Sequence, residues 1–240
     1  MGKIIGQWIG DLFDGLRIVC TDGTRWDFED KISERSSVNN NLSLKSKIPE
    51  ADAQAVYNAR QFQGASVGSE AIIKVRMQIP PKEGMHPTQY ATQQPSSTTI
   101  EEILRLEYFN EKGCSVTPRL LHKEKIIQGP NLSIPGGYIV FIVMEKVPGV
   151  PLTDFWTYDR PKRDRIREAF QKGMIEIRSF GGYSTDMSLQ NLIYDEQGDK
   201  CYFVDYEGFR IDINQAKFGF DQNDYHFWGL AYDQDGEEVL

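Results

Sequence analysis

The alternation of apolar and polar residues predicts a β-rich first half of the chain. Leu16–Cys20 and Arg25–Phe28 both alternate, and Asp22-Gly23 between them is a strong signal for a hairpin with a type I′ turn. Glu70–Ile79 is rich in β-branched residues and alternates in the same way. We therefore predict a hairpin near the start of the chain and a further strand at Glu70–Ile79.

The second half of the chain contains the most apolar run and the clearest helix. Gly137–Val147 includes the run YIVFIVMEKV, which predicts a buried strand. Arg160–Ser179 has a strong helical period, and Asp159 is suited to cap its first turn. The apolar positions of this helix are Ile166, Phe170, Met174 and Ile177.

The remaining segments are shorter or more polar. Ala51–Gln61 has the composition of a helix, and Thr99–Lys112 predicts a helix that Gly113 ends. The polar stretches Ser33–Ser46 and Pro80–Ser97 predict loops.

Two short strands, Leu192–Tyr194 and Cys201–Val204, are separated by a turn-forming stretch. Together with the elements above, they predict an α+β fold. The break at Pro148–Pro151 is a candidate boundary between two parts of the chain.

The composition is that of an ordinary globular protein of 240 residues, 40% hydrophobic and 26% charged. The 27 basic and 35 acidic residues give a formal net charge of −8. This balance argues against nucleic acid or an anionic membrane as the main partner, because both select basic surfaces. The sequence gives no indication of the oligomeric state.

The cysteines and histidines are few and scattered along the chain. They are Cys20, Cys114, Cys201, His86, His122 and His226. None of their spacings matches a metal site, and a sparse, odd number of cysteines is typical of a reducing compartment. No apolar run approaches the length of a membrane span, and acidic residues interrupt the first apolar stretch, so we expect a cytoplasmic protein.

Three polar residues near the short hairpin form the main candidate site. Asp186 is followed by Asn191 in a D-x4-N spacing, and Asp205 comes 14 residues later at the end of a strand. This spacing is that of kinase catalytic loops, in which the first Asp accepts a proton and the other two residues hold Mg²⁺. Alternatively, Asp186 and Asn191 cap a turn and Asp205 ends a strand.

A lysine on a predicted strand extends this pattern. Lys74 ends the run Ala71-Ile72-Ile73-Lys74, which is similar to the V-A-I-K motif. A charged amine among apolar residues needs a partner, and Glu102 on the next predicted helix is a candidate. Two other interpretations remain open: Lys74 faces solvent from an edge strand, or Glu102 forms a capping box with Thr99.

The stretches SEAIIKVRMQIP, EEILRLEYFNEKGCSVTPRLL and PGGYIVFIVMEKVPGVPL, with Asp186–Asp205, resemble the protein-kinase-like superfamily. The resemblance spans roughly Leu16 to Arg210. It is nearer to the aminoglycoside phosphotransferase and choline kinase branch than to Ser/Thr kinases. More narrowly, the sequence resembles a group of uncharacterised fungal kinase-like proteins.

This resemblance implies a two-lobed fold, with a β-rich N-terminal lobe over residues 1–147 and a reduced, mostly helical C-terminal lobe over 148–240. ATP would bind between the lobes, with Mg²⁺. The linker near Met144–Val147 would contact the adenine through Glu145 and Val147, and Lys74 would contact the phosphates.

Several positions depart from the family pattern. Ser184 stands where the family has histidine, Ser188 where protein kinases have lysine, and Tyr206-Glu207 follows Asp205 as in the small-molecule branch. No G-x-G-x-x-G loop is present, although the hairpin at Asp22-Gly23 is a possible substitute. The 35 residues after Asp205 leave no room for helices that dock protein substrates.

Two functions follow from these features. The first is an ATP-dependent phosphotransferase acting on a hydroxyl of a small molecule. The second is a catalytically weak pseudokinase that binds a nucleotide or a protein. A third interpretation, a hydrolase nucleophile elbow at Gly64–Gly68, fits poorly because the predicted helix precedes the serine and the strand follows it.

Overall fold

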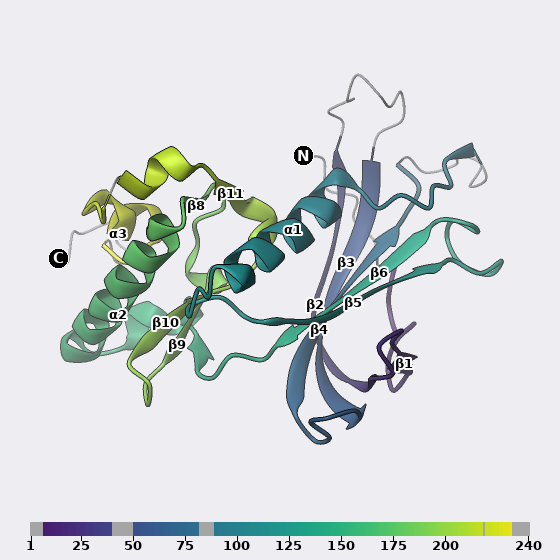
Figure 1. Ribbon diagram of the computed structural model, residues 1–240, viewed down its shortest axis with the longest axis horizontal. Helices are drawn as coiled ribbons and strands as arrows, with labels where there is room; N and C mark the ends of the chain where they lie inside the picture. Colours follow the sequence, from purple (N-terminus) through teal and green to yellow (C-terminus); the bar gives the residue numbers. More distant parts are fainter. Residues whose placement is uncertain (1–6, 40–49, 82–88, 218, 232–240) are drawn as a thin grey trace. The chain divides into compact units, whose positions relative to one another are not determined.

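The computed structural model describes residues 7–39, 50–81, 89–217 and 219–231, and it contains both helices and strands (Figure 1). The mixed helix and strand content predicted from the sequence is therefore confirmed. Contacts among the residues divide the chain into two compact units. The first unit comprises Met1–Ile100 and Leu120–Lys146, and the second comprises Glu101–Arg119 and Val147–Leu240.

The first unit contains a six-stranded antiparallel sheet in the order β1-β2-β3-β4-β6-β5. Its strands are β1 Arg17–Val19, β2 Arg25–Asn39, β3 Glu50–Gln63, β4 Glu70–Gln78, β5 Leu120–Ile127 and β6 Tyr138–Glu145. The predicted strands at Glu70–Ile79 and Gly137–Val147 are confirmed as β4 and β6. Strand β5 was not predicted, because half of its residues are polar and all of them are half-exposed or exposed.

The hairpin of β1 and β2 is confirmed, but its turn differs from the predicted type I′ turn. Gly23 has a φ of 84°, whereas Asp22 does not have a positive φ. The Gly23 N–H donates to the Cys20 carbonyl at 3.0 Å, and the Cys20 N–H donates to the Thr24 carbonyl at 2.9 Å. The loop is therefore a three-residue hairpin turn in which glycine takes the single left-handed position.

The helix predicted at Ala51–Gln61 is wrong, since this segment lies within strand β3. Alanine and glutamine favour helices in isolation, but β3 pairs with β2 on one side and β4 on the other. Its apolar side chains recur at every second position and are buried in the core, at Ala51, Ala53, Ala55, Tyr57 and Ala59. The period of two decided the structure, rather than the composition.

The loop predicted at Ser33–Ser46 is also wrong for residues 33–39, which continue β2. Ser36 and Val38 are buried, and this polar segment keeps its strand pairing as far as Asn39, opposite Glu50. Residues 40–46 lie outside the described residues. The described part of Pro80–Ser97 forms bends and turns before the next helix.

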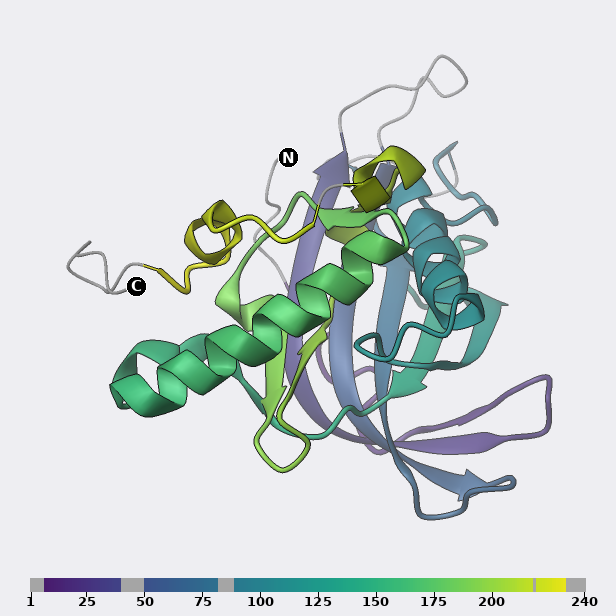
Figure 2. The same ribbon diagram turned by 60° about the vertical axis from the view of Figure 1, so that its left-hand side comes forward.

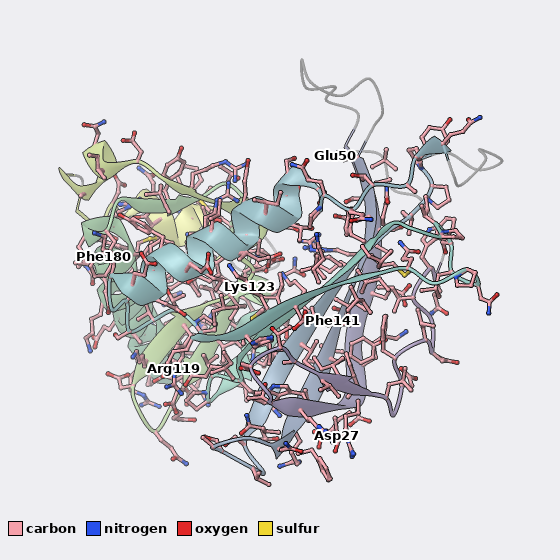
Figure 3. All side chains as sticks on the ribbon, turned by 45° about the vertical axis from the view of Figure 1, so that its right-hand side comes forward. Asp27, Glu50, Arg119, Lys123, Phe141 and Phe180 are labelled. Atoms are coloured by element: carbon pink, nitrogen blue, oxygen red, sulfur yellow. The ribbon has the colours of Figure 1, made fainter. Side chains whose placement is uncertain are left out.

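The sheet of the first unit curls around an apolar interior (Figure 1). Phe13 stacks on Phe28 at 5.6 Å between ring centroids, and it meets Phe141 edge-on at 5.5 Å. Phe141, which lies on β6, is labelled in Figure 3. The turn after β1 reaches the opposite edge strand, where the Thr21 N–H donates to Glu124 Oε2 at 2.8 Å.

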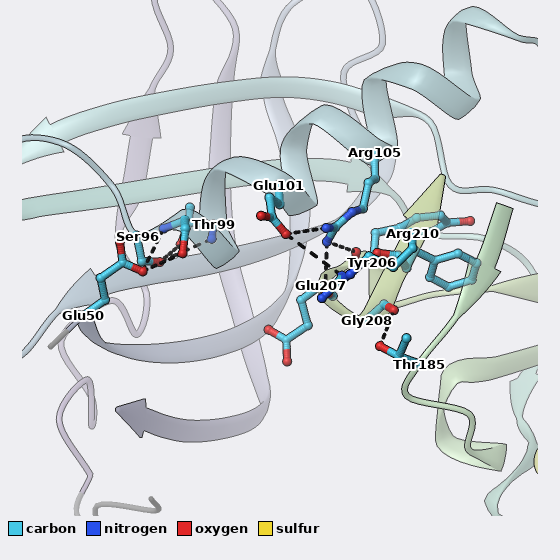
Figure 4. Close-up of polar contacts among 12 residues, drawn as sticks. Glu50, Ser96, Thr99, Glu101, Arg105, Thr185, Tyr206, Glu207, Gly208 and Arg210 are labelled. Atoms are coloured by element: carbon cyan, nitrogen blue, oxygen red, sulfur yellow. Dashed lines mark hydrogen bonds and ion pairs between the residues drawn. The ribbon is translucent and has the colours of Figure 1, made fainter. Parts of the chain in front are cut away.

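The other face of β3 is polar and holds the start of helix α1 (Ser97–Glu111). Asp52 is buried, and its Oδ2 accepts hydrogen bonds from Ser96 Oγ at 2.6 Å and Thr99 Oγ1 at 3.3 Å. Ser96 Oγ also accepts from the Thr99 N–H at 3.3 Å, so Ser96 caps the helix (Figure 4). The helix begins before Thr99, and the capping box considered for Thr99 and Glu102 is therefore wrong.

The second unit contains two small sheets, residues 101–111 of α1 and the helical elements that follow α1 in the sequence. Strands β7 Val150–Pro151, β9 Leu192–Asp195 and β10 Lys200–Phe203 form one sheet, and β8 Gly182–Ser184 pairs with β11 Phe209–Ile211. The helical elements are η2 Leu152–Thr157, α2 Arg160–Ser179, η3 Leu189–Asn191, η4 Tyr206–Gly208, η5 Ile213–Lys217 and α3 Asn223–Phe227. The predicted hairpin of β9 and β10 is confirmed.

Helix α2 has the bounds predicted from its period, and it packs against β10 (Figure 2). Asp159 caps it by accepting a hydrogen bond from the Lys162 N–H at 2.9 Å. A Cβ added at Gly173 would lie 3.1 Å from the Cys201 carbonyl oxygen, so the glycine permits the close approach of helix and strand. No helix in the described ranges combines the length and the apolar character required to cross a bilayer.

Candidate active site

The loop that carries Asp186 is held in the second unit by its own neighbours. The Asp186 N–H donates to Ser184 Oγ at 3.1 Å, and Asn191 Nδ2 donates to the Asp186 carbonyl at 3.0 Å. Asn191 is buried, whereas Asp186 is exposed. Ser184 therefore orients this loop, and the Asp186 side chain is open to solvent.

Asp205 lies in an uncommon backbone conformation, with φ 65° and ψ 80°. The left-handed region costs a residue other than glycine about 1–2 kcal/mol, although aspartate tolerates it better than most. Such conformations persist only where the surrounding structure holds them, and they are frequent at functional sites.

The turn after Asp205 is anchored by aromatic packing. Tyr206 stacks on Phe209 with ring centroids 4.5 Å apart, and its hydroxyl donates to Thr117 Oγ1 at 2.7 Å. Burial raises the pKa of Tyr206, so the phenol keeps its proton for this hydrogen bond. These contacts hold the η4 turn in place and so maintain the strained conformation of Asp205.

The Asp186 loop and the η4 turn are in direct contact. The N–H and Oγ1 of Thr185 both donate to the Gly208 carbonyl, at 2.9 and 2.8 Å (Figure 4). A Cβ added at Gly208 would lie 2.7 Å from the Asp186 Cβ, which is closer than real side chains approach. The Val204 N–H donates to the Asn191 carbonyl at 2.9 Å. Residues 13 or more positions apart in sequence thus meet in one unit.

Three carboxylates gather beside this loop. Oxygens of Glu102 on α1, Asp205 and Glu207 lie within 4.8 Å of one another. Glu102 is buried, and the other two are half-buried. Carboxylate oxygens this close together suit Mg²⁺. Glu207 was not predicted as a ligand, although its position two residues after Asp205 is a signal.

Arg105 also contacts this turn and was not predicted from the sequence. Its Nη1 donates to the carbonyls of Tyr206 at 3.3 Å and Glu207 at 2.9 Å, and its Nη2 pairs with Glu101 (Figure 4). Burial lowers the pKa of Arg105, and the hydrogen bond to Glu101 acts in the opposite direction. Arg105 therefore holds the backbone of the turn next to the carboxylates. A single arginine on a helix gives no sequence signal for such a contact.

Lys74 lies in the first unit, on β4 between β3 and β6, opposite Val56 and Ile142. It is buried, so the alternative of an edge-strand lysine facing solvent is wrong. Glu102 belongs to the second unit, and its ion pair with Lys74 stays a prediction.

The two residues predicted to contact the adenine lie near the end of β6. Glu145 is the last residue of this strand and is half-buried, and Val147 is buried. Their contacts with a nucleotide stay predictions.

The hydrolase interpretation of Gly64–Gly68 is wrong. This segment is the turn between antiparallel strands β3 and β4, and the Ser69 N–H donates to the Ser66 carbonyl at 3.0 Å. A nucleophile elbow requires a strand before the serine and a helix after it. Gly64 and Gly68 have positive φ values of 140° and 89°, so the glycines serve the turn.

The spacings of the cysteines and histidines indicated no metal site, but one cysteine and one histidine come together in the fold. The fold brings His122 next to Cys20 and Asp22, with possible ligand atoms within 4.8 Å of one another. His86 lies outside the described residues.

No protein-family profile matches the sequence, and no curated protein sequence is similar to it. Among solved structures, the PK-1 kinase of Cydia pomonella granulovirus resembles the chain with a TM-score of 0.39 and 16% sequence identity. The matched region covers 73% of this chain and 52% of that kinase. The chain thus spans about half the length of this structural neighbour.

Proposed function

We propose that this chain is an ATP-dependent phosphotransferase of the kinase-like superfamily that phosphorylates a hydroxyl of a small molecule. One observation carries the proposal: the Asp186 loop packs against the turn after Asp205, beside a cluster of three carboxylates. A phosphoryl-transfer site needs an accessible base and oxygen ligands for a metal around one phosphate chain.

The residues present fit Mg²⁺, because they offer hard oxygen donors close together. Asp205 and Asn191 would hold the ion, and Glu207 is an additional oxygen donor. When bound, Mg²⁺ neutralises negative charge on the phosphate oxygens. Glu102 is the proposed partner of Lys74.

The proposed chemistry assigns Asp186 as the general base. The acceptor hydroxyl oxygen forms a bond to the γ-phosphorus of ATP as the bond from this phosphorus to the β–γ bridging oxygen breaks. Asp186 takes the hydroxyl proton, and ADP leaves with the bridging oxygen. Lys74 would contact the phosphates, while Glu145 and Val147 would contact the adenine.

The proposal includes a two-lobed arrangement, with residues 1–147 as the N-terminal lobe and 148–240 as the C-terminal lobe, in a cytoplasmic protein. The small-molecule acceptor is supported by Tyr206-Glu207 after Asp205, which resembles the aminoglycoside phosphotransferase and choline kinase branch.

A second candidate is a pseudokinase that binds a nucleotide or a protein without efficient transfer. The absence of a G-x-G-x-x-G motif from the whole sequence favours it, because that loop covers the phosphates in kinases. Serine at position 184 is a further departure from the kinase pattern.

Thermal unfolding with ATP and Mg²⁺ tests the proposal. ATP at 100 times its dissociation constant stabilises the folded state by about 2.7 kcal/mol. We expect a raised melting temperature and slow ATP hydrolysis, with hydrolysis lost in Asp186→Asn. Stabilisation without turnover of ATP across a panel of small hydroxyl compounds would favour the pseudokinase. No stabilisation by any nucleotide would refute the phosphotransferase and the nucleotide-binding pseudokinase, and would leave only a pseudokinase that binds a protein.

A further inference from the structure

Four side chains meet where the curled sheet of the first unit closes. Cys20 follows β1 and Asp22 lies in the turn, whereas His122 and Glu124 lie on β5, about 100 residues later. Possible ligand atoms of Cys20, Asp22 and His122 lie within 4.8 Å of one another. None of these residues takes part in the proposed phosphoryl transfer.

The two carboxylates face opposite nitrogens of the imidazole. His122 Nδ1 lies 3.1 Å from Asp22 Oδ2, and His122 Nε2 lies 3.2 Å from Glu124 Oε2. The other oxygen of Asp22, Oδ1, accepts hydrogen bonds from the N–H and Oγ1 of Thr24 at 2.9 and 2.7 Å. Asp22 is thus oriented by its own turn, with one oxygen directed at the imidazole.

The backbone contributes to this arrangement on both strands. The pairing of β5 with β6 has an irregularity between Leu120 and His122, and such bulges re-aim a side chain. Glu124 Oε2 is held by the N–H of Thr21 at 2.8 Å. Cys20 is buried, and the side chains of His122 and Glu124 are only 11% and 15% exposed. The cluster is therefore a partly enclosed set of oriented groups rather than a row of surface charges.

The donor set indicates which ligand this cluster would take. A thiolate, an imidazole and a carboxylate are ligands of Zn²⁺, whereas Mg²⁺ and Ca²⁺ prefer oxygen alone. Histidines that bind zinc usually donate their second N–H to a carboxylate, which fixes the ring. Glu124 stands at this position beside His122 Nε2. A divalent cation would also offset the negative charges of the two carboxylates, and its binding would displace the proton of the Cys20 thiol.

We propose that Cys20, Asp22 and His122 bind Zn²⁺, with His122 ligating through Nδ1 and Glu124 accepting the hydrogen bond of Nε2–H. Water occupies the fourth position of a tetrahedral site. The ion joins the turn after β1 to β5, and β1 and β5 are the two edge strands of the sheet. The bound ion would thus link the two edges of the curled sheet and stabilise its closed form.

Titration of the metal-free full-length chain with Co²⁺ and then Zn²⁺ tests this proposal. We expect one Co²⁺ per chain, a thiolate-to-cobalt charge-transfer band, and displacement of Co²⁺ by Zn²⁺. Cys20→Ser should lose the band. Cys114→Ser is the matched control, because it removes a buried thiol of the second unit and should keep the band.

Two further variants separate a metal site from a simple ion-pair cluster. Glu124→Gln should weaken Zn²⁺ binding about 10- to 100-fold, as loss of a supporting carboxylate does. Asp22→Asn should weaken it at least about tenfold, and the exposed Asp22 can be replaced without disturbing the core.

The proposal is overturned if the wild-type chain binds no stoichiometric Co²⁺ or Zn²⁺, which would leave only the contacts between the imidazole and the two carboxylates. It is also overturned if folded Cys20→Ser keeps the charge-transfer band. If Cys20→Ser does not fold, Asp22→Asn decides: unchanged Zn²⁺ affinity overturns the site, and a loss of at least about tenfold supports it. ATP binding is measured separately, so failure of the phosphotransferase proposal is distinguishable.

Discussion

Replacing Gly208 with alanine tests whether the Asp186 loop packs directly against the turn after Asp205. The added Cβ would lie 2.7 Å from the Asp186 Cβ and 3.3 Å from the Asp186 nitrogen. Gly208 is buried and its φ is not positive, so alanine suits the backbone and the effect is steric. Relief of the overlap requires the Asp186 loop to move, together with the two hydrogen bonds from Thr185 to the Gly208 carbonyl.

The expected magnitude follows from two opposing contributions. Overpacking a closely packed site costs about 1–3 kcal/mol. Replacing glycine by alanine also restricts the unfolded chain, which stabilises the folded state by about 0.4–1 kcal/mol. Gly219→Ala is the matched control in the same unit, because an added Cβ there meets no atom within 4 Å and the φ of Gly219 is not positive. The two variants share the unfolded-state contribution, so their difference isolates the overlap.

Urea unfolding followed by tryptophan fluorescence gives this difference. We expect Gly208→Ala to unfold with a free energy about 1–3 kcal/mol lower than Gly219→Ala, at an unchanged dependence on urea concentration. The rate of ATP hydrolysis should also be lower in Gly208→Ala, because the variant displaces the loop that carries Asp186. Equal unfolding free energies for the two variants, within about 0.5 kcal/mol, would refute the contact between the loop and the turn.

Three further predictions concern the packing and charge of the described residues. Phe170→Ala should lower the free energy of unfolding, measured by urea titration, by about 3–5 kcal/mol, because the ring is fully buried. Ile175 is on the exposed face of the same helix, so Ile175→Ala should change the free energy of unfolding by less than about 0.5 kcal/mol. Asp159→Ala should cost about 1 kcal/mol through loss of the α2 cap, and Asp159→Ser should restore most of it by the same measurement. The hydrogen bond from Lys146 holds the pKa of Glu70 below its ordinary value, so this pair stabilises the fold above pH about 4.3 and the effect is lost as pH falls through the folded pKa. Carboxyl NMR should show the Glu70 pKa rising in Lys146→Met, and an unchanged pKa would contradict the pairing.

The elements that the sequence predicted correctly are those whose side-chain period and end signals agree. Helix α2 has one apolar stripe, a capping aspartate and the bounds expected from both. Strand β6 is apolar throughout its buried length, and buried strands can be recognised from such runs. In both elements the local preference and the tertiary environment point to the same structure.

Strand β3 was mispredicted because its composition and its environment conflict. Its alanines favour a helix, but neighbouring strands on both sides supply the backbone hydrogen bonds. Only the alternation at Ala51, Ala53 and Ala55 carried the correct signal. The polar end of β2 was predicted as a loop because its side chains are mostly polar. It is a strand because its backbone pairs with β3, and this pairing is not visible in the local sequence.

The candidate site was predictable where it is local in sequence. The spacing of Asp186, Asn191 and Asp205 placed them at one small hairpin. In the structure, Asn191 Nδ2 donates to the Asp186 carbonyl, and the N–H of Val204, next to Asp205, donates to the Asn191 carbonyl. Arg105 could not be predicted, because its contacts with the η4 turn depend on packing between segments about 100 residues apart. The approach of His122 to Cys20 depends likewise on the curl of the sheet.

The measurement that tests the central claim most directly is calorimetric titration of ATP into the full-length chain, with Mg²⁺ and with EDTA. The matched variants are Asp205→Asn and Asp199→Asn, since both aspartates have positive φ, at 65° and 45°, and both lie in the second unit. The account predicts Mg²⁺-dependent ATP binding that Asp205→Asn removes and Asp199→Asn keeps. Absence of ATP binding, or an affinity for ATP that neither EDTA nor Asp205→Asn lowers, would contradict it.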